Sequence, residues 1–179
     1  MDDRPDPLAD LEVIEFGSLS PELRAELEGD EPDPFDAEGI ELEFRAKPHH
    51  VALRNPDGRL VASTGLIEVE VEVASEHFPV VGFGGVIVNA RYRGRGLGRS
   101  VVHEALKKAQ GMGPAFALLF CHPSRAGLYR RLDFAPVDSP VSVEQPQGSA
   151  EMPEYTMWHP LTPGATWPAG PVVVRSLPF

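Results

Sequence analysis

Apolar and polar residues alternate along several segments in the first half of the chain, and this alternation predicts β-strands. It is clearest from Arg59 to Val73, where valine and isoleucine alternate with glutamate, so that the apolar side chains share one face. A looser alternation from Leu11 to Phe16 predicts a first strand at a sheet edge. The run from Val51 to Arg54 is followed by Asn-Pro-Asp-Gly at 55–58, which predicts a hairpin because these residues favour turns.

Three other segments show the spacing and end signals of helices. Ser20 as an N-cap and Gly29 as a stop predict a helix over 21–27. A longer helix is predicted from Leu97 to a Gly-Met-Gly-Pro stop, with an apolar stripe of Val101, Val102, Ala105, Leu106 and Ala109. A short helix is predicted over 123–131.

The remaining segments predict a turn over 75–78, a strand from Pro79 to Val88 and a buried strand over 115–121. Glycines at 82, 84 and 85 interrupt the first of these strands and predict a bulge there. Further strands follow Phe134. The acidic, proline-interrupted segment 30–39 is either a solvated linker or a lid over an acceptor site.

The most informative stretch is residues 85–102, which predicts a strand, a glycine-rich turn and a helix. Its glycines allow close approach of a ligand to the backbone, and the helix start offers unpaired N–H groups and partial positive charge. Arginines stand beside them at 93, 95 and 99. This combination predicts a site for a pyrophosphate-bearing ligand, the alternative being a glycine-rich connection with incidental arginines.

The spacing of the glycines narrows the choice of ligand. The third glycine of the dinucleotide fingerprint is replaced by Arg99, and no Gly-Lys-Ser/Thr tripeptide of a P-loop follows. What fits is Arg-x-x-Gly-x-Gly, from Arg93 to Gly98.

Composition limits the class of protein. The 179 residues are 42% hydrophobic and 24% charged, which predicts one globular domain over 1–179 with a flexible segment at 1–10. The formal net charge of −11 argues against nucleic-acid binding and is compatible with a cationic acceptor. The single cysteine, an N-terminus without an apolar core and the lack of a membrane-length apolar run predict a cytoplasmic protein that does not bind membranes.

The Arg-x-x-Gly-x-Gly motif and the Val-x-Val strand before it resemble the acyl-CoA-binding motif of the GCN5-related N-acetyltransferases (the GNAT superfamily). A second segment, from Ser124 to Phe134, resembles the family's Asn-x-x-Ala-x-x-Leu-Tyr-x-x-x-Gly-Phe run, with Ser124 in place of Asn and Asp133 in place of Gly. The resemblance implies a single-domain α/β (α+β) fold. In that fold a mixed, mostly antiparallel sheet splays between its fourth and fifth strands and is flanked by helices.

The resemblance also implies acetyl-CoA as co-substrate and transfer of its acetyl group to a primary amine by direct attack, without a metal. The residues that it assigns to CoA binding are Val86, Ile87, Val88, Arg93, Gly94, Arg95, Gly96, Leu97, Gly98, Arg99 and Ser124. Two alternatives stay open: an acetyltransferase that acts on a protein amine, and a non-catalytic acyl-CoA-binding module. The acceptor is not specified by the sequence. Exchange of a terminal strand, which is common in this fold, would give a homodimer.

Tyr129 matches a position where many members of the family place a tyrosine beside the CoA sulfur, which implies a general acid, or else a packing residue. The general base is less defined, because glycines stand at 82–85 where relatives often carry a glutamate. Candidates are Glu70 of the long alternating strand, acting through a water, and His122 at the end of the buried strand. Each has a structural alternative, as does Cys121, which is either an acyl-carrying nucleophile or a buried thiol.

The C-terminal segment, with Trp158, Trp167 and Phe179, is similar to the tails of aminoglycoside 2′-N-acetyltransferases and nodulation N-acyltransferases. In the first of these groups the terminal carboxylate lies close to the acceptor site. This similarity implies a carboxylate of Phe179 near the acceptor and tryptophans that stack on a sugar. The alternative is a tail that only closes the edge of the sheet.

Overall fold

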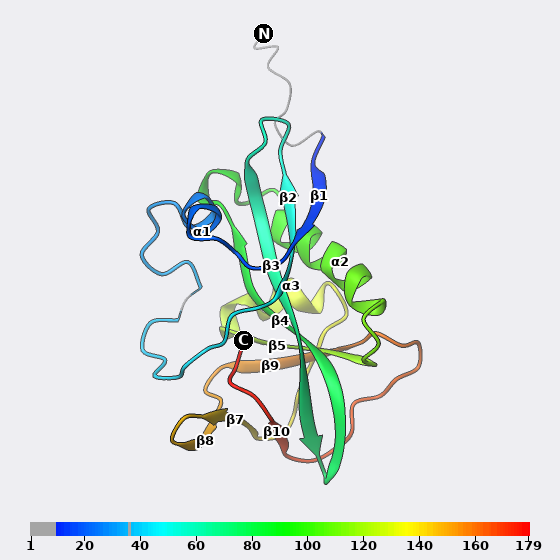
Figure 1. Ribbon diagram of the computed structural model, residues 1–179. Helices are drawn as coiled ribbons and strands as arrows, with labels where there is room; N and C mark the ends of the chain where they lie inside the picture. The colour runs from blue at the N-terminus through cyan, green and yellow to red at the C-terminus, as the bar shows by residue number, and fades with distance from the viewer. Residues whose placement is uncertain (1–9, 36) are drawn as a thin grey trace.

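One curled, mixed sheet occupies the centre of the molecule in the computed structural model, which describes residues 10–35 and 37–179 (Figure 1). The expected flexible segment at 1–10 lies outside the described residues, apart from Asp10. The sheet has the strand order β6-β9-β5-β4-β3-β10-β7-β8, and β1 and β2 extend it from β3. This confirms the expected mixed, splayed sheet with flanking helices.

The first four strands form an antiparallel unit, as the alternation predicts. They are β1 (Glu12–Phe16), β2 (His49–Arg54), β3 (Leu60–Val73) and β4 (Glu76–Val88). The predicted turn at 75–78 is too long, because only Ala74 and Ser75 form it, both with positive φ. Two residues with positive φ suit the twist of a tight hairpin, so β4 begins at Glu76.

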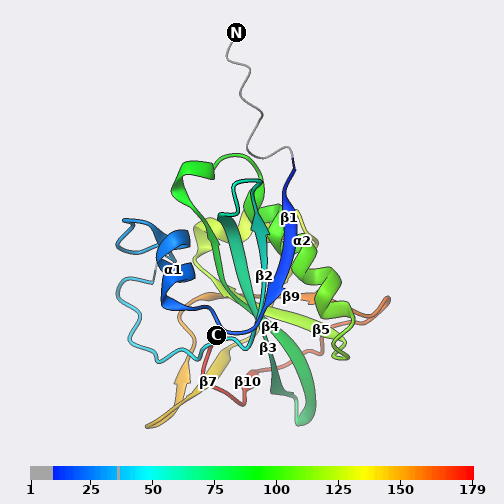
Figure 2. The ribbon, with the colours of Figure 1, turned by 45° about the horizontal axis from the view of Figure 1, so that its top comes forward.

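Two helices cover opposite faces of these strands (Figure 2). Helix α1 (Pro21–Glu28) is capped by Ser20, whose Oγ accepts a hydrogen bond from the Leu23 N–H at 3.2 Å. Helix α2 (Leu97–Gln110) buries the predicted apolar stripe. Alternate residues of β2 point to the two sides, since Ala52 packs in the cluster with Leu27 of α1 and Val51 packs in the cluster with the stripe of α2.

The bulge predicted in β4 is confirmed by its register with β3. Ser63 lies opposite Ile87 and Gly65 lies opposite Gly84, so β4 carries one more residue than β3 between these pairs. Gly85, within the bulge, has a φ of +61°, which residues other than glycine rarely adopt.

Strand β5 (Phe116–Cys121) is parallel to β4, but the two strands pair only from Val81–Ala117 to Phe83–Leu119. Beyond this point they separate, and the bulge of β4 lies on one side of the opening. After β5 come a 3-10 turn, η2 (Pro123–Arg125), and the short helix α3 (Ala126–Arg130). A second 3-10 turn, η1 (Ala90–Tyr92), lies between β4 and the glycine loop and is not predicted by the sequence pattern.

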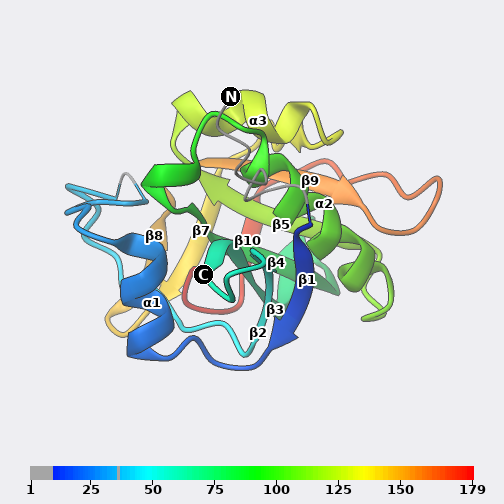
Figure 3. The same ribbon diagram turned by 90° about the horizontal axis from the view of Figure 1, so that it is seen from above.

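The last fifty residues contribute strands on both sides of the β4–β5 pair. The strands are β6 (Ala135–Pro136), β7 (Val141–Gln145), β8 (Gly148–Glu151), β9 (Tyr155–Pro160) and β10 (Val172–Val174). Strand β9 pairs with β5, whereas β10 lies between β3 and β7. The chain then turns back, and its end lies over the middle of the sheet (Figure 3). Among the described residues, no helix is long and apolar enough to span a membrane.

Candidate active site

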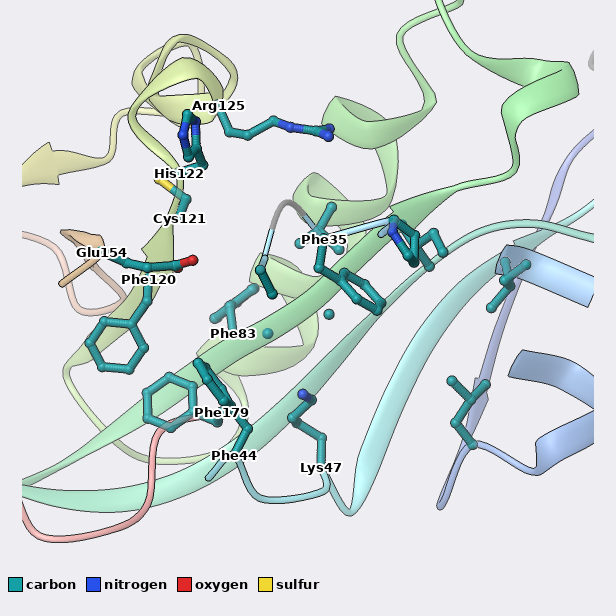
Figure 4. Close-up of a pocket in the computed structure, with 18 of the residues that line it drawn as sticks. Phe35, Phe44, Lys47, Phe83, Phe120, Cys121, His122, Arg125, Glu154 and Phe179 are labelled. Atoms are coloured by element: carbon teal, nitrogen blue, oxygen red, sulfur yellow. The ribbon is translucent and has the colours of Figure 1, made fainter. Parts of the chain in front are cut away.

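A cavity of about 330 Å3 lies where β4 and β5 separate. Its walls come from distant parts of the chain: the bulge of β4, the end of β5, helix α3, the segment between α1 and β2, and the C-terminal end. Figure 4 shows side chains from these segments facing one space, with Lys47 and Phe179 on one side and His122 and Arg125 on the other.

The bulge forms the β4 side of this cavity. Gly85 and Val86 have no pairing partner on β3, because they lie between the Gly84–Gly65 and Ile87–Ser63 pairs. Val86 and Ile87 line the cavity, whereas Val88 does not line it and pairs with Ala62. Backbone groups released from the ladder in this way are available to a ligand.

The loop before α2 contains two glycines in a left-handed conformation. Gly94 and Gly96 have φ values of +75° and +79°, so the loop depends on glycine at both positions. Gly96 is the N-cap of α2 and provides no side-chain hydrogen bond to the helix, so the first N–H groups of α2, beginning at Leu97, have no side-chain cap. This end of the helix therefore carries donors and partial positive charge.

The three arginines of the motif differ in their contacts. Arg93 donates from Nε to the carbonyl of Val88 at 3.1 Å and pairs with Glu31, so it links the loop to β4 and to the segment after α1. Arg95 and Arg99 are exposed beside the helix start and make no ion pair within the described part of the chain. We conclude that Arg93 shapes the loop and that Arg95 and Arg99 are available to an anion.

Tyr129 of α3 lines the cavity and is buried. Burial raises the pKa of its hydroxyl far above the usual value, and the nearby Cys121 raises it further. Its ring packs edge-on against Phe134, with 5.8 Å between ring centres. The raised pKa keeps the phenol protonated at neutral pH, so it has a proton to donate.

Cys121, at the end of β5, is also buried and lines the cavity. Burial, together with Glu154, raises the pKa of this thiol to about 12. A thiol with that pKa is almost entirely protonated at neutral pH, and the thiolate is the nucleophilic form. The environment therefore favours the buried-thiol interpretation over the acyl-cysteine.

His122 and Ser124 are joined by hydrogen bonds. The Nδ1 of His122 lies 2.8 Å from Oγ of Ser124 and accepts a hydrogen bond from its backbone N–H at 3.2 Å, which caps η2. His122 lines the cavity, whereas Ser124 does not. The structure therefore assigns both residues a local structural role, and only His122 also faces the site.

Glu70 lies elsewhere. It is opposite Pro79 on the exposed face of the long hairpin and its carboxylate lies 3.1 Å from Nδ1 of His77, outside the residues that line the cavity. The structure therefore does not place Glu70 near the other candidate catalytic residues, Tyr129 and His122. Trp158 and Trp167 also lie outside the cavity, where they stack on one another with ring centres 6.0 Å apart.

Phe179 lines the cavity from its C-terminal side. Its ring packs on Phe120, with 5.0 Å between ring centres, and a β-carbon built on Gly84 would lie 2.5 Å from its carbonyl carbon. The tail therefore contributes both its last ring and its last backbone group to the site, beside the bulge.

Pro34 and Phe35 line the cavity and belong to the segment 30–39, for which the sequence left a linker and a lid open. Other cavity residues had no signal in the sequence: Phe44 reaches the cavity from the segment before β2, and Glu154 reaches it from the residues before β9. Lys47 is the most notable, because burial lowers the pKa of its amine to about 8 and Arg24 contributes to the shift. Among the described residues, no group of three or more His, Cys, Asp or Glu could hold a metal.

Residues 29–137 match a family described as an acetyltransferase (GNAT) domain, and the chain therefore belongs to this family. Solved structures of the same fold include the GNAT family N-acetyltransferase YhbS from Escherichia coli in complex with CoA. It has 18% identity, a TM-score of 0.60 and coverage of 96% of this chain and 93% of that one.

A GNAT family acetyltransferase from Brucella melitensis in complex with acetyl-CoA has 16% identity, a TM-score of 0.56 and coverage of 91% and 94%. The match to a GCN5-related N-acetyltransferase from Kribbella flavida has 24% identity and a TM-score of 0.45. It covers 49% of this chain and 22% of the length of that protein. Comparison with curated protein sequences finds no match.

Proposed function

We infer that the protein transfers an acetyl group from acetyl-CoA to the primary amine of a small molecule, by direct attack of the amine on the thioester. The observation that carries this inference is the opening between β4 and β5. A buried tyrosine lines this opening, and the glycine loop, whose Gly98 lies against Leu128 of the cavity wall, leads into a helix start suited to an anion. The similar proteins from E. coli and B. melitensis were solved with CoA and acetyl-CoA, which supports the same donor here.

The donor would bind along β4. Its pyrophosphate would lie on the backbone N–H groups of residues 94–99, with Arg95 and Arg99 beside it. The pantetheine arm would follow the opening and the thioester would reach the bulge, where unpaired backbone N–H groups can stabilise the oxyanion of the tetrahedral intermediate. Binding energy at the pyrophosphate would thus position the reacting carbonyl.

The transfer proceeds in two steps. The neutral amine forms a C–N bond to the acetyl carbon while the carbonyl π electrons move to oxygen. The intermediate then collapses, the C–S bond breaks with its electron pair on sulfur, and Tyr129 donates a proton to the CoA thiolate. The ammonium proton leaves to solvent, and the tyrosine recovers a proton from solvent, so that the products are the N-acetylamine and CoA.

The environment of Tyr129 suits this role for a specific reason. Burial that raises the pKa of the tyrosine also raises that of the neighbouring Cys121 thiol to about 12. The same surroundings would raise the pKa of the CoA thiol, so that its thiolate is a stronger base than in water. The thiolate can then accept a proton from Tyr129 even though the pKa of the tyrosine is raised as well.

The experiment that tests the function measures release of the CoA thiol from acetyl-CoA in the presence of a panel of primary amines. We expect release that depends on both substrates, with the N-acetylated product identified by mass spectrometry. Calorimetric titration with CoA is run in parallel. Tight CoA binding without release for any amine would instead indicate an acyl-CoA-binding module.

A further inference from the structure

Lys47 enters the cavity because glycines leave room for it. A β-carbon built on Gly65 of β3 would lie 2.7 Å from Cβ and 2.8 Å from Cγ of Lys47, which is closer than real side chains approach. A β-carbon on Gly84 would lie 3.3 Å from its Nζ, and one on Gly85 would lie 3.6 Å from it. The ammonium group therefore lies directly beside the bulge, and Figure 4 shows it directed into the cavity.

The segment that carries Lys47 is held in place from the C-terminal side. The backbone N–H of Arg45 donates to the carbonyl of Pro178 at 2.8 Å, and the Arg45 guanidinium donates to Oγ of Ser176 at 3.0 Å. Two residues earlier, the side chain of Gln145 bonds both the N–H and the carbonyl of Glu43. Lys47 thus has a defined position although it lies in a loop.

Lys47 makes no ion pair among the described residues, and the last backbone group of Phe179 lies against the same Gly84 that its Nζ approaches. Other charged groups of the cavity are paired. Arg24 pairs with Glu28 at 3.5 Å, and Arg125 and Glu154 face the site from the opposite side. A half-buried ammonium without a partner pays for desolvation, which is the cause of its lowered pKa. An anion bound next to it would remove this cost.

We propose that Lys47 binds the carboxylate of the acceptor, and that the acceptor is an α-amino acid with an apolar side chain. This proposal rests on the proposed function, since it assigns the acceptor of the same site. Phe35, Phe44 and Phe120 line the cavity and offer apolar surface for the side chain of the amino acid. An ammonium–carboxylate contact supplies the charge-assisted hydrogen bond that fixes its orientation.

The position of Lys47 favours an acceptor whose carboxylate is close to its reacting amine. Its Nζ lies beside the bulge, where the thioester would be held, and not at the distant rim of the cavity. An α-amino acid, whose amine and carboxylate are joined through one carbon atom, can place its acid group at Lys47 while its amine attacks at the bulge. A lysine side chain or a polyamine places no acid group there.

The positive charge of Lys47 is opposite in sign to the net charge of the protein. The net charge of −11 attracts cations to the surface, but within a half-enclosed cavity the nearest group dominates because screening is weaker. The acidic surface therefore does not determine the acceptor, and the ammonium beside the bulge does.

The test compares phenylalanine with phenylalaninamide and phenethylamine, and leucine with leucinamide, in the thiol-release assay. Rates are expressed per concentration of neutral amine, because the three kinds of acceptor differ in amine pKa. We expect kcat/KM for the amino acids to exceed that for the amides by about tenfold or more. Lys47→Met should abolish this preference, Lys47→Arg should retain part of it, and Lys107→Met, on the exposed side of α2, should leave it unchanged.

A binding measurement separates this proposal from the proposed function. Phenylalanine is titrated into the CoA-loaded protein and into CoA-loaded Lys47→Met, after CoA binding by the variant has shown that it is folded. Lys47-dependent binding without turnover of any amine would support the acceptor site and overturn the transferase. Turnover of amines with no preference for the acids, or a preference that Lys47→Met preserves, would overturn the role of Lys47 and leave the transferase. Absence of both binding and turnover would overturn both.

Discussion

Gly65 and Lys47 are eighteen positions apart in the sequence and in van der Waals contact in the fold: a β-carbon on Gly65 would lie 2.7 Å from Cβ of Lys47. Lys47 can pack against this position of β3 because glycine has no side chain there. This contact connects the central sheet to the segment between α1 and β2, and it holds Lys47 at the bulge.

Gly65→Ala is therefore expected to displace Lys47 and to raise KM for an acidic acceptor severalfold, while KM for acetyl-CoA changes little. Steady-state kinetics with each substrate varied in turn measures both values. The control is Gly127→Ala in α3, where an added β-carbon meets no atom within 4 Å. Equal effects of the two substitutions would contradict the contact.

Tyr129→Phe should lower kcat by about a hundredfold, the usual range for loss of a general acid, with little change in KM for acetyl-CoA. The ring and its packing on Phe134 are retained, so the loss isolates the hydroxyl. Tyr155→Phe removes a different hydroxyl, one that accepts from Arg130 at 3.2 Å outside the cavity, and serves as the control. An unchanged kcat in Tyr129→Phe would exclude the general-acid role.

Gly96→Ala should weaken CoA binding as well as fold stability. The φ of +79° at Gly96 strains any residue with a side chain by about 1 kcal/mol, and relief of this strain would distort the start of α2. Gly113→Ala is also strained, at a φ of +113° after the end of α2, and should lower stability without affecting CoA. Urea unfolding and calorimetric titration of both variants distinguish the two effects.

Cys121 should react slowly with iodoacetamide in the native protein at pH 8 and rapidly after unfolding, because burial raises the pKa of its thiol to about 12. Alkylation followed by mass spectrometry measures both rates. Cys121→Ala should keep most of the transferase activity. Loss of activity in a variant that still binds CoA would point to an acyl-cysteine intermediate instead of direct attack.

Lys47→Met should stabilise the protein most below pH 8. The pKa of Lys47 falls from 10.5 to about 8 on folding, so the folded state disfavours the charged amine. The resulting penalty is complete below pH 8 and is relieved as the pH rises towards 10.5, where the unfolded chain also loses its proton. Urea unfolding of both proteins at a series of pH values should show a stability difference that shrinks over this range.

The local pattern of the sequence was sufficient for much of the fold. Strand β3 follows the alternation of its valines and glutamates, α1 begins at its serine cap, and the bulge of β4 falls among the expected glycines. The tail was predicted least well. Its short strands pair with distant partners, β9 with β5 and β10 with β3, and no periodicity within so few residues indicates a partner.

The donor half of the candidate site was also visible in the sequence, because the strand, the glycines and the helix that follow one another from 85 to 102 are neighbours in the chain. The spacing of these residues excludes a dinucleotide fingerprint and a P-loop, and their resemblance to the GNAT motif indicates CoA. Glu70 shows the limit of this reasoning. It belongs to the expected strand, but β3 is long, and its position along the hairpin places it beside His77 and away from the bulge.

The residues of the proposed acceptor half were brought together by tertiary structure alone. Lys47, Phe120 and Glu154 line one cavity because a loop, a strand end and the residues before β9 converge on one opening, although these residues are far apart in the chain. Local sequence determines backbone conformation through short-range sterics and hydrogen bonds. Which side chains share a cavity depends instead on how distant segments pack against the sheet. The glycines of β3 and β4 leave space for Lys47, and the sequence cannot show which residue occupies that space.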